Sequence, residues 1–557
     1  MADYDYGGDA EQAELKKLAA DVDANPDEFE VWEKLVAAVE GQEGGLTRNS
    51  SSQAITLARE TYDRFLAKFP LFFGYWKKYA DMEMKVAGTE AAEMVYERGV
   101  ASITSSVDLW ANYCAFKVET SHDSDVIRDL FERAANSVGL DFLAHPFWDK
   151  CLEFEERMDA HDKIFAILSR VIHIPMHQYA RYFERYQQMS MQRPLSELAE
   201  PEDLARFRKE VEMAGPQGRS DFELERDLRT RIAASHHEIF QVTQTETTKR
   251  WTYEQEIKRP YFHVTELDDA QIANWRKYLD FEEHEGSYQR VAFLYERCLV
   301  TAARYEEFWL RYARWMLAQK DKQQEVRNIY ERASCLHVPI AEPAIRLQYA
   351  RFEEMSGRVD VAEAIHEEIL SVLPSHIETL KSWGNLIRRQ HGVDAAVAHY
   401  CNFIDSPDCD TPTKAALVVE WARLVWKVKG SAEEARAIMQ KQQHWYLDSR
   451  PFWSAYLLFE LDQPTGAATE AEHHQRIKAI HDEIQQKSRL HSSTIKELSH
   501  IYMEYLLERG TEDAAKEYMR LDQEVNGPAS VSTIRKLKDE DKDMSANGQL
   551  APLRYTG

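Results

Sequence analysis

The sequence predicts an all-α protein, a solenoid of stacked helix pairs arranged in two blocks. Three observations carry this prediction. A Trp-Tyr motif recurs along the chain, a second aromatic motif follows it at a nearly fixed distance, and Gly (21) and Pro (17) are scarce for 557 residues. A chain of this length is too long for one compact core, so a repeat array or several domains are expected.

Residues 1–24 are predicted to precede the repeats as an acidic N-terminal segment. The opening "MADYDYGGDAEQAELKK" lacks an apolar core, unlike a signal peptide. The first repeat block is expected over 25–190.

The first helix of each repeat is marked by Trp followed three residues later by Tyr. "YWKKYADMEMK" (75–85), "LWANYCAFKVE" (109–119), "NWRKYLDFEEH" (274–284) and "FWLRYARWMLA" (308–318) share this pattern. The spacing places both aromatic residues on one face of a helix. We interpret that face as core, since a stripe at helical spacing is far more often packing than a ligand site.

The second helix of each repeat is marked by "VYERG" (95–99), "LFERA" (130–134), "LYERC" (294–298) and "IYERA" (329–333). Its aromatic residue lies about 20 residues after the Trp, which predicts two helices joined by a short turn and stacked on the next pair. The Glu-Arg of the motif is interpreted as an ion pair that fixes the packing of repeats. The predicted repeat core comprises Trp76, Tyr79, Tyr96, Trp110, Tyr113, Phe131, Trp148, Trp275, Tyr278, Tyr295, Trp309, Tyr312 and Tyr330.

The pattern lapses over 191–264, which is predicted to be a linker with a loop, mobile around 214–220, and one long connecting helix. The linker ends in "KRWTYEQEIKRPYFHV" (249–264), where basic and aromatic residues alternate. Such a mixture suits either a nucleic-acid site or a structural joint between blocks. We favour the joint, formed by Trp251, Tyr253, Arg259, Pro260, Tyr261 and Phe262.

Two details of this joint are expected. Pro260 disfavours helical geometry at Arg259, so the chain must extend or turn there. Tyr261 and Phe262 are then expected to cover the exposed end of the C-terminal block, while the basic residues of the stretch pair with acids of neighbouring repeats.

The second repeat block is expected over 265–522, with weaker copies after residue 375. One copy, "IRLQYARFEE" (345–354), has Arg346 where the others have Trp. This part has more large apolar residues than its weak repeats require, and such an excess can mark an interface. The candidate dimer interface comprises Trp421, Trp426, Trp445, Tyr446, Trp453, Tyr456, Tyr502 and Tyr505. Residues 523–557 are predicted to be a disordered tail.

Charge and motif content point away from catalysis. With 95 acidic and 69 basic side chains, the chain has a formal net charge of -26, which disfavours a nucleic-acid backbone and favours protein partners. No P-loop, GxGxxG, GxSxG or HExxH pattern is present, and the six cysteines form no CxxC pair. No catalytic, cofactor-binding or metal site is therefore predicted. His236/His237 and His473/His474, with His481, are weak metal candidates and are better explained as parts of helix faces.

The Trp-x-x-Tyr helix followed by a Tyr-Glu-Arg-Ala helix resembles the half-a-tetratricopeptide (HAT) repeat of RNA-processing scaffolds. Together with "GYWKKYADME" (74–83), "SVDLWANY" (106–113), "YEEFWLRYARWM" (305–316) and the stretch 249–264, it resembles the pre-mRNA-processing factor 39 family. The family of the paralogous factor 42 is the second choice. The resemblance covers roughly 25–520 and is thin beyond 375.

The resemblance implies a nuclear, non-enzymatic scaffold without a cofactor, shaped as a curved arch of two HAT blocks. Such proteins support U1 small nuclear ribonucleoprotein assembly and 5′ splice-site recognition by docking on the U1 C protein and the U1 seventy-kilodalton protein. They dimerise through their C-terminal blocks, with themselves or with a paralogue. Two alternatives stay open: an RNA-binding module that contacts small nuclear RNA, and a HAT scaffold of another complex such as cleavage stimulation factor. No membrane partner is expected.

Overall fold

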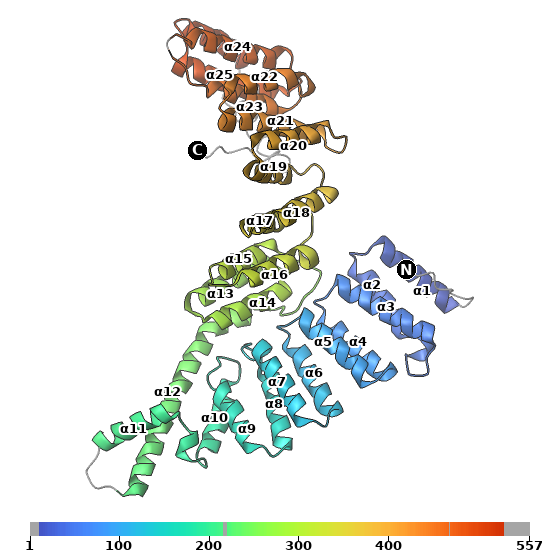
Figure 1. Cartoon of the computed structure of the whole chain (residues 1–557), viewed down its shortest axis with the longest axis vertical. Coiled ribbons are helices and arrows are strands. Elements are labelled where there is room, and N and C mark those ends of the chain that lie inside the picture. Colours follow the sequence, from blue (N-terminus) through green and yellow to red (C-terminus); the bar gives the residue numbers. More distant parts are fainter. Residues whose placement is uncertain (1–9, 215–219, 467, 528–557) are drawn as a thin grey trace. The chain divides into compact units, whose positions relative to one another are not determined.

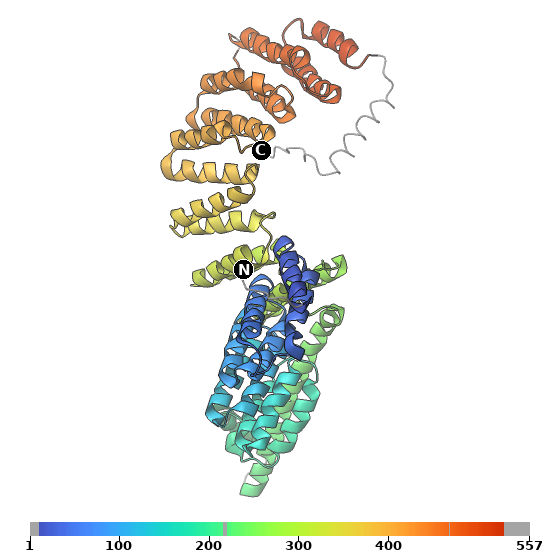
Figure 2. The ribbon, with the colours of Figure 1, turned by 90° about the vertical axis from the view of Figure 1, so that its right-hand side faces the viewer.

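The structure, a computed structural model, describes residues 10–214, 220–466 and 468–527, and all regular secondary structure in these residues is helical (Figure 1). The chain divides into two compact units, unit 1 (Met1–Val338) and unit 2 (Pro339–Gly557). In both, helices that follow one another in sequence stack side by side as pairs (Figure 2). The predicted all-α repeat solenoid is confirmed.

Unit 1 contains α1 (Ala10–Ala24), α2 (Phe29–Glu40), η1 (Gln42–Gly44), α3 (Ser52–Lys68), α4 (Phe73–Val86), α5 (Thr89–Ser102), α6 (Val107–Thr120), α7 (Ser124–Val138), α8 (His145–Arg157), α9 (His161–Val171), α10 (Tyr179–Ser190), η2 (Leu195–Glu197), α11 (Pro201–Ala214), α12 (Asp221–Glu256), α13 (Asp269–Glu285), α14 (Tyr288–Thr301), α15 (Glu306–Leu317), α16 (Gln323–Arg332) and the π-helical turn η3 (Ala333–His337).

Unit 2 contains α17 (Ala344–Met355), α18 (Val359–Val372), α19 (Ile377–His391), α20 (Val393–Asp405), α21 (Thr411–Leu424), the π-helical turn η4 (Val425–Lys429), α22 (Ala432–Gln442), η5 (Gln443–Trp445), α23 (Arg450–Leu461), α24 (Glu470–Gln486), α25 (Ser492–Arg509) and α26 (Ala514–Val525).

Short polar caps start many of these helices and keep the turns tight. Ser106 accepts a hydrogen bond from the backbone N–H of Leu109 at the start of α6, and Asp123 caps α7 in the same manner. Gly88, between α4 and α5, has a φ of 100°, a conformation that favours glycine because it lacks a Cβ. These local signals allow a repeat to turn within a few residues.

The predicted core aromatic residues are all buried. Those of the N-terminal repeats, from Trp76 to Trp148, belong to one continuous apolar core that extends from Leu15 in α1 to Ile232 in α12 and also includes Phe262 and Ala303. The N-terminal acidic segment contributes to it, because Leu15, Ala19 and Val22 of α1 are buried.

The long connecting helix is α12, 36 residues long, which starts with a capping box formed by Ser220 and Glu223. The predicted mobile loop lies largely in 215–219, outside the described residues, and the predicted tail beyond 527 lies outside them as well.

The division between units does not coincide with the block boundary expected near residue 265. Helices α13–α16 belong to unit 1, because contacts from the joint and from α14 tie them to the N-terminal helices. Ser105, just before α6, donates a hydrogen bond of 3.4 Å to the carbonyl oxygen of Glu296 in α14. Phe262 belongs to the same core as the N-terminal repeats. The helix pattern alone does not reveal such long-range contacts.

Candidate functional site

The arginine of the second-helix motif joins each repeat of unit 1 to the repeat before it. Arg133 of α7 donates two hydrogen bonds of 2.9 Å to Glu97, the motif glutamate of α5. Arg332 of α16 binds Glu296 of α14 at 2.9 and 2.7 Å. The series continues with Arg98–Asp63, Arg170–Glu132 and Arg297–Glu254. We call this series the arginine ladder.

The same arginines cover the tryptophan of their own repeat. The guanidinium of Arg133 lies 5.8 Å from the ring centroid of Trp110, and that of Arg332 lies 5.4 Å from Trp309. The indole N–H of Trp110 donates to the carbonyl oxygen of Thr104 at 2.9 Å, which secures the turn before α6. Trp32, Trp76, Trp148 and Trp309 make equivalent bonds. The side chains of these tryptophans are therefore engaged in the packing of the repeats.

Tyrosine stacking completes the contact between repeats. The ring of Tyr96 stacks on that of Tyr113 in the next repeat, with 5.2 Å between centroids and 6° between planes. Tyr295 and Tyr312 stack at 4.6 Å. The hydroxyl of Tyr113 donates to Glu97 at 2.7 Å, so the stack and the arginine ladder share one carboxylate. Burial raises the pKa of Tyr96 to about 12.

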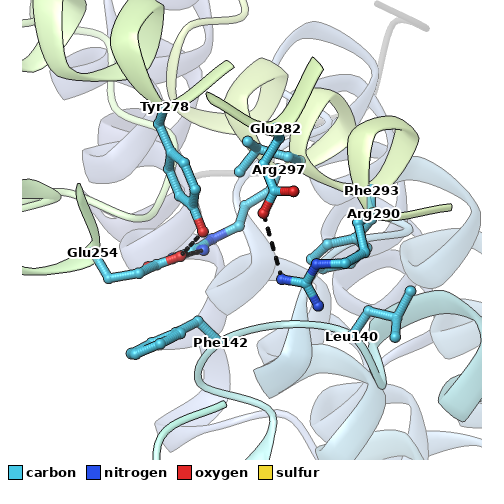
Figure 3. Close-up of a pocket in the computed structure, with 9 residues that line it drawn as sticks. Leu140, Phe142, Glu254, Tyr278, Glu282, Arg290, Phe293 and Arg297 are labelled. Carbon is cyan, nitrogen blue, oxygen red and sulfur yellow. Dashed lines mark hydrogen bonds and ion pairs between the residues drawn. The ribbon is translucent and has the colours of Figure 1, made fainter. Parts of the chain in front are cut away.

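The C-terminal end of α12 takes the place of a second helix in this series. Tyr253 stacks on Tyr278 with 5.0 Å between centroids and 6° between planes. Glu254 accepts hydrogen bonds of 2.6 and 2.7 Å from Arg297 and one of 2.8 Å from Tyr278 (Figure 3). The stretch 249–264 thus contains a copy of the motif with Gln255 in place of the arginine. The adjacent Tyr253 and Glu254 were the signal that could have revealed it.

Arg297 is the buried member of the arginine ladder. Its side chain forms ion pairs with Glu254 and, at 3.3 Å, with Asp141 in the turn after α7, and all three side chains are buried. Burial opposes the charge of Arg297, but Asp141 and Glu254 outweigh this effect and hold its pKa above the ordinary value. Burial raises the pKa of Asp141, and Arg297 offsets this rise only in part. This triad fastens α14 to the N-terminal helices.

A second buried ion pair connects α12 to α13. Arg250 donates to Glu282 at 2.6 and 3.1 Å, and their side chains are only 2% and 1% exposed. Arg290 of α14 lies 3.5 Å from the same carboxylate (Figure 3). Burial lowers the pKa of Arg290. Removing one member of such a cluster leaves a buried charge unpaired, at a cost of about 3–5 kcal/mol.

The cavity between these groups is small. It is lined by Arg290, Arg297, Glu254, Tyr278 and Phe142, among others, and has a volume of about 10 Å³ (Figure 3). That is room for about one water molecule, whereas small-molecule sites typically measure about 300–1,000 Å³. The clustered charges are thus a structural network.

Phe262 and Tyr261 of the joint make contacts that differ from those predicted from the sequence. Phe262 is buried against Phe72, at the start of α4, with 5.1 Å between ring centroids. It therefore packs against the N-terminal repeats as well as against Arg304, which follows α14 in the expected C-terminal block. Tyr261 is 48% exposed and covers neither. The expectation was wrong for Tyr261, whose side chain is exposed, and incomplete for Phe262, which also contacts the N-terminal repeats because α12 returns the chain to α2–α4.

The remaining joint residues end the helix and connect it to the core. Trp251 is partly exposed and lies 6.0 Å from the rings of both Phe142 and His177. Helix α12 ends at Glu256, so Arg259 and Pro260 lie outside it in irregular structure.

The basic residues of the joint are largely occupied. Lys249 pairs with Glu246 and Glu285, and Arg250 with Glu246 and Glu282. Arg259 instead donates to the hydroxyl and carbonyl oxygens of Thr265, at 2.9 and 3.0 Å.

The candidate dimer residues are mostly interior in unit 2. Tyr446, Trp453, Tyr456, Tyr502 and Tyr505 are buried within its core, so they are not available to a partner in this conformation. Trp421 and Trp426 are partly buried against the same core. Trp445 is 68% exposed. The excess of aromatic residues in this part of the chain therefore mainly fills the repeats.

The histidines singled out from the sequence also have packing partners. The imidazole of His236 lies 3.2 Å from the hydroxyl of Tyr186, His473 lies 2.7 Å from the carbonyl oxygen of Glu460, and His481 lies 2.9 Å from the hydroxyl of Ser499. Within residues 10–214, 220–466 and 468–527, no group of three or more His, Cys, Asp or Glu side chains is arranged to hold a metal ion. In the same ranges no helix has the length and apolarity needed to cross a membrane.

Comparison with known proteins identifies the repeats. The family model described as "PRP39 N-terminal HAT repeat" matches residues 16–188, and "PRP39 C-terminal HAT repeat" matches residues 248–389. Pre-mRNA-processing factor 39 of Schizosaccharomyces pombe is 50% identical over 97% of this chain and 91% of its own length. The human protein of that name is 31% identical over 76% of this chain and 65% of its own length. The chain belongs to the pre-mRNA-processing factor 39 family.

Two more distant matches bear on the paralogue and the fold. The U1 small nuclear ribonucleoprotein component PRP42 of Saccharomyces cerevisiae is 24% identical over 56% of this chain and 58% of its own length. A crystal structure of CSTF-77 superposes with a TM-score of 0.52 and 14% identity, covering 87% of this chain and 91% of that one. At that identity, the likeness to CSTF-77 concerns the fold alone.

Proposed function

We propose that this member of the pre-mRNA-processing factor 39 family is a non-catalytic scaffold in nuclear pre-mRNA splicing, where it supports U1 small nuclear ribonucleoprotein assembly and 5′ splice-site recognition. The observation that carries the proposal is the match of both PRP39 HAT family models to a chain that is 50% identical to a named pre-mRNA-processing factor 39. A related PRP42 is named as a component of the U1 particle. This family membership favours splicing over another machine such as the cleavage stimulation factor.

The chemistry of the interior supports a scaffold over an enzyme. Buried ionisable side chains can mark the active site of an enzyme. Here they form ion pairs between helices, Arg297 with Glu254 and Arg250 with Glu282. Their shared cavity is too small for a substrate. A repeat solenoid instead offers an extended surface for protein partners.

The proposed partners are the U1 C protein and the U1 seventy-kilodalton protein. A tagged full-length chain, incubated in nuclear extract and recovered for mass spectrometry, is expected to enrich proteins of the U1 particle. Direct binding is then measured with the two purified proteins. Enrichment of another processing complex without U1 proteins would contradict the proposal.

Dimerisation, with a second copy or with a paralogue, is the second part of the proposal. Trp445 is the exposed aromatic residue among the candidates of unit 2, and a large apolar side chain in water is a suitable contact for a partner. Analytical ultracentrifugation at micromolar concentration is expected to give a dimer for the wild type and a weaker dimer for Trp445→Ser. Tyr261→Ser, an exposed aromatic position in unit 1, is the matched control. A wild-type monomer would exclude the homodimer.

Direct RNA binding through 249–264 is not favoured. Lys249 and Arg250 pair with acidic side chains, and Arg259 holds the connection to Thr265, so these cations are engaged. Binding of U1 small nuclear RNA across a salt series tests this alternative, with Lys258→Glu/Arg259→Glu as the variant. Specific binding that the variant abolishes, without loss of fold, would revive it.

A further inference from the structure

The connection between α12 and α13, residues 257–268, carries a threonine in surroundings that suit a phosphate group. We propose that Thr265 is a phosphorylation site for a protein kinase that selects acidic substrates, and that Arg259 binds the resulting phosphate. The proposal rests on the geometry of this segment and is independent of the proposed role in splicing.

Thr265 is accessible and lies in backbone without regular structure. Its side chain is exposed, and residues 257–268 lie between helices. Protein kinases bind their substrates in an extended form, and residues 257–268, up to the start of α13 at Asp269, contain no helix that would have to unwind. Thr265 is therefore accessible to a kinase, and its backbone conformation suits a kinase substrate.

The residues after Thr265 supply the acidic context. "TELDD" places Glu266, Asp268 and Asp269 one, three and four residues after the hydroxyl, and all three are exposed. A kinase with a basic substrate groove is attracted to such a sequence by complementary charge. In the reaction, the Thr265 oxygen attacks the γ-phosphorus of ATP and forms a new P–O bond. The bond from that phosphorus to the β–γ bridging oxygen breaks, ADP leaves, and the hydroxyl proton passes to the catalytic carboxylate of the kinase.

The guanidinium of Arg259, which we call the cationic cradle, already contacts the hydroxyl. The Nη1 atom of Arg259 donates to Thr265 Oγ1 at 2.9 Å. The Nδ1 atom of His263 lies 2.8 Å from the same oxygen and accepts a hydrogen bond from the backbone N–H of Thr265. Arg259 is held in place because its Nη2 donates to the carbonyl oxygen of Thr265 at 3.0 Å. Its Nε atom is buried and has no hydrogen-bond partner among the described residues, so a donor remains for a phosphate oxygen.

This arrangement favours the product of the reaction. A phosphothreonine carries about −1.5 to −2 charges at neutral pH, and the planar guanidinium matches the spacing of phosphate oxygens. The acidic side chains of Glu266, Asp268 and Asp269 oppose the added charge. They are exposed and therefore screened by water and salt, whereas Arg259 is in direct contact with the modified oxygen.

Residues 257–268, which the bound phosphate would hold in place, pack against the N-terminal repeats. Phe262 packs against Phe72, and the guanidinium of Arg304 lies 5.9 Å from the Phe262 ring. Arg304 also donates to the carbonyl oxygen of Val264 at 3.3 Å. A phosphate bound between Thr265 and Arg259 would tighten this connection, so phosphorylation would stabilise the contact of the segment with α4.

An acidic context alone does not make such a site, and the chain provides a matched control. Ser105 also has an aspartate three residues later, Asp108. However, Ser105 is buried and its hydroxyl is bonded to the carbonyl oxygen of Glu296. It lacks both the accessibility and the cationic cradle of Thr265.

Phosphorylation is tested on the folded full-length chain with ATP and casein kinase 2, a kinase of this specificity. Tandem mass spectrometry is expected to find phosphate on Thr265 and none on Ser105, and Thr265→Val is expected to lose that phosphopeptide. Phosphate on other exposed serines or threonines with none on Thr265 would overturn the proposal.

The cradle is tested by hydrogen exchange of the phosphorylated and unphosphorylated chains. Charge-assisted hydrogen bonds of the expected kind should slow exchange in 257–268 by about tenfold. Arg259→Gln should still accept the phosphate, yet its exchange in this segment should not slow. Equal exchange in wild type with and without phosphate on Thr265, or equal slowing in Arg259→Gln, would overturn the role of the cradle.

Discussion

The two units stack helix pairs in the same manner but join successive repeats with different side chains. In unit 1, Tyr96 stacks on Tyr113, and Arg133 reaches back to Glu97. In unit 2, an imidazole takes the place of the first tyrosine, because His481 stacks on Tyr502 with 4.5 Å between centroids. At these two contacts between repeats a flat ring is stacked on a tyrosine, and it is supplied by tyrosine in unit 1 and by histidine in unit 2.

Other parts of the repeat are shared by the two units. Glu282 lies seven residues after Trp275 and pairs with Arg250 of the preceding helix. Glu460 lies seven residues after Trp453 and pairs with Arg436 of the preceding helix in unit 2. A buried carboxylate one heptad after the tryptophan is therefore a feature that both units share, and it is less visible in the sequence than the aromatic motif.

Even the tryptophan can be replaced when its hydrogen bond is kept. In unit 1 the indole N–H of Trp76 donates to the carbonyl oxygen of Pro70 at 2.8 Å. In unit 2 Arg346 occupies the tryptophan position and donates to the carbonyl oxygen of Pro339 at 3.0 Å. Both residues secure the turn before their helix, so Arg346 keeps the hydrogen bond of this position although the ring is lost.

The largest expected effect comes from the buried end of the arginine ladder. Arg297→Met leaves Asp141 and Glu254 buried without their cation, so we expect unit 1 to lose about 3–5 kcal/mol of stability. Urea unfolding followed by pulsed hydrogen exchange and mass spectrometry reports each unit separately. Arg133→Met, at an exposed position of the same ladder, is the control and should cost about 1 kcal/mol or less. Equal losses for the two variants would contradict the assigned role of burial.

The histidine stack should make unit 2 sensitive to mild acid. Burial lowers the pKa of His481 to about 4 from its ordinary value of 6.5. The folded unit keeps this imidazole neutral while the unfolded chain binds a proton below pH 6.5, so stability falls as the pH decreases from about 6.5 towards 4. Between pH 7 and pH 5 the loss from this group is on the order of 2 kcal/mol.

The variant His481→Gln separates this effect from other titrations in unit 2. Glutamine can still bond to Ser499 but does not titrate, so the variant should lose less stability than the wild type between pH 7 and pH 5. The measurement is the same urea unfolding at both pH values. Parallel losses in the two proteins would show that His481 is not responsible.

The smallest expected effect is at an exposed rung of the arginine ladder. Arg133 holds the pKa of Glu97 below its ordinary value, so the stabilising contribution of Glu97 is present above about pH 4.5 and is lost as the pH falls through its folded pKa. Glu97→Gln should cost about 1 kcal/mol or less at pH 7, since the pair is partly exposed, and this cost should shrink as the pH falls below about 4.5. A cost that stays the same in acid would point to packing instead of charge.

The sequence was most informative where the aromatic and the charged residues of the repeat motif recur together. Trp110, Phe131, Trp309 and Tyr330 could be placed in the core because their spacing repeats and each lies on one face of a helix. It was least informative at His481, because a histidine that keeps the geometry of the repeat there does not resemble the motif. The candidate dimer residues show the same limit, since a buried and an exposed aromatic residue are alike in a sequence.

By itself, the sequence determined that this chain is a helical repeat protein of the HAT type, since local periodicity is set by contacts between neighbouring helices. Only the tertiary structure decided that 249–264 ends one repeat and that Phe262 returns to α4. It also decided that Arg259 holds Thr265 instead of an acid. The physical reason is that these contacts depend on the course of α12, which joins residues far apart in the chain and leaves no periodic trace in the sequence.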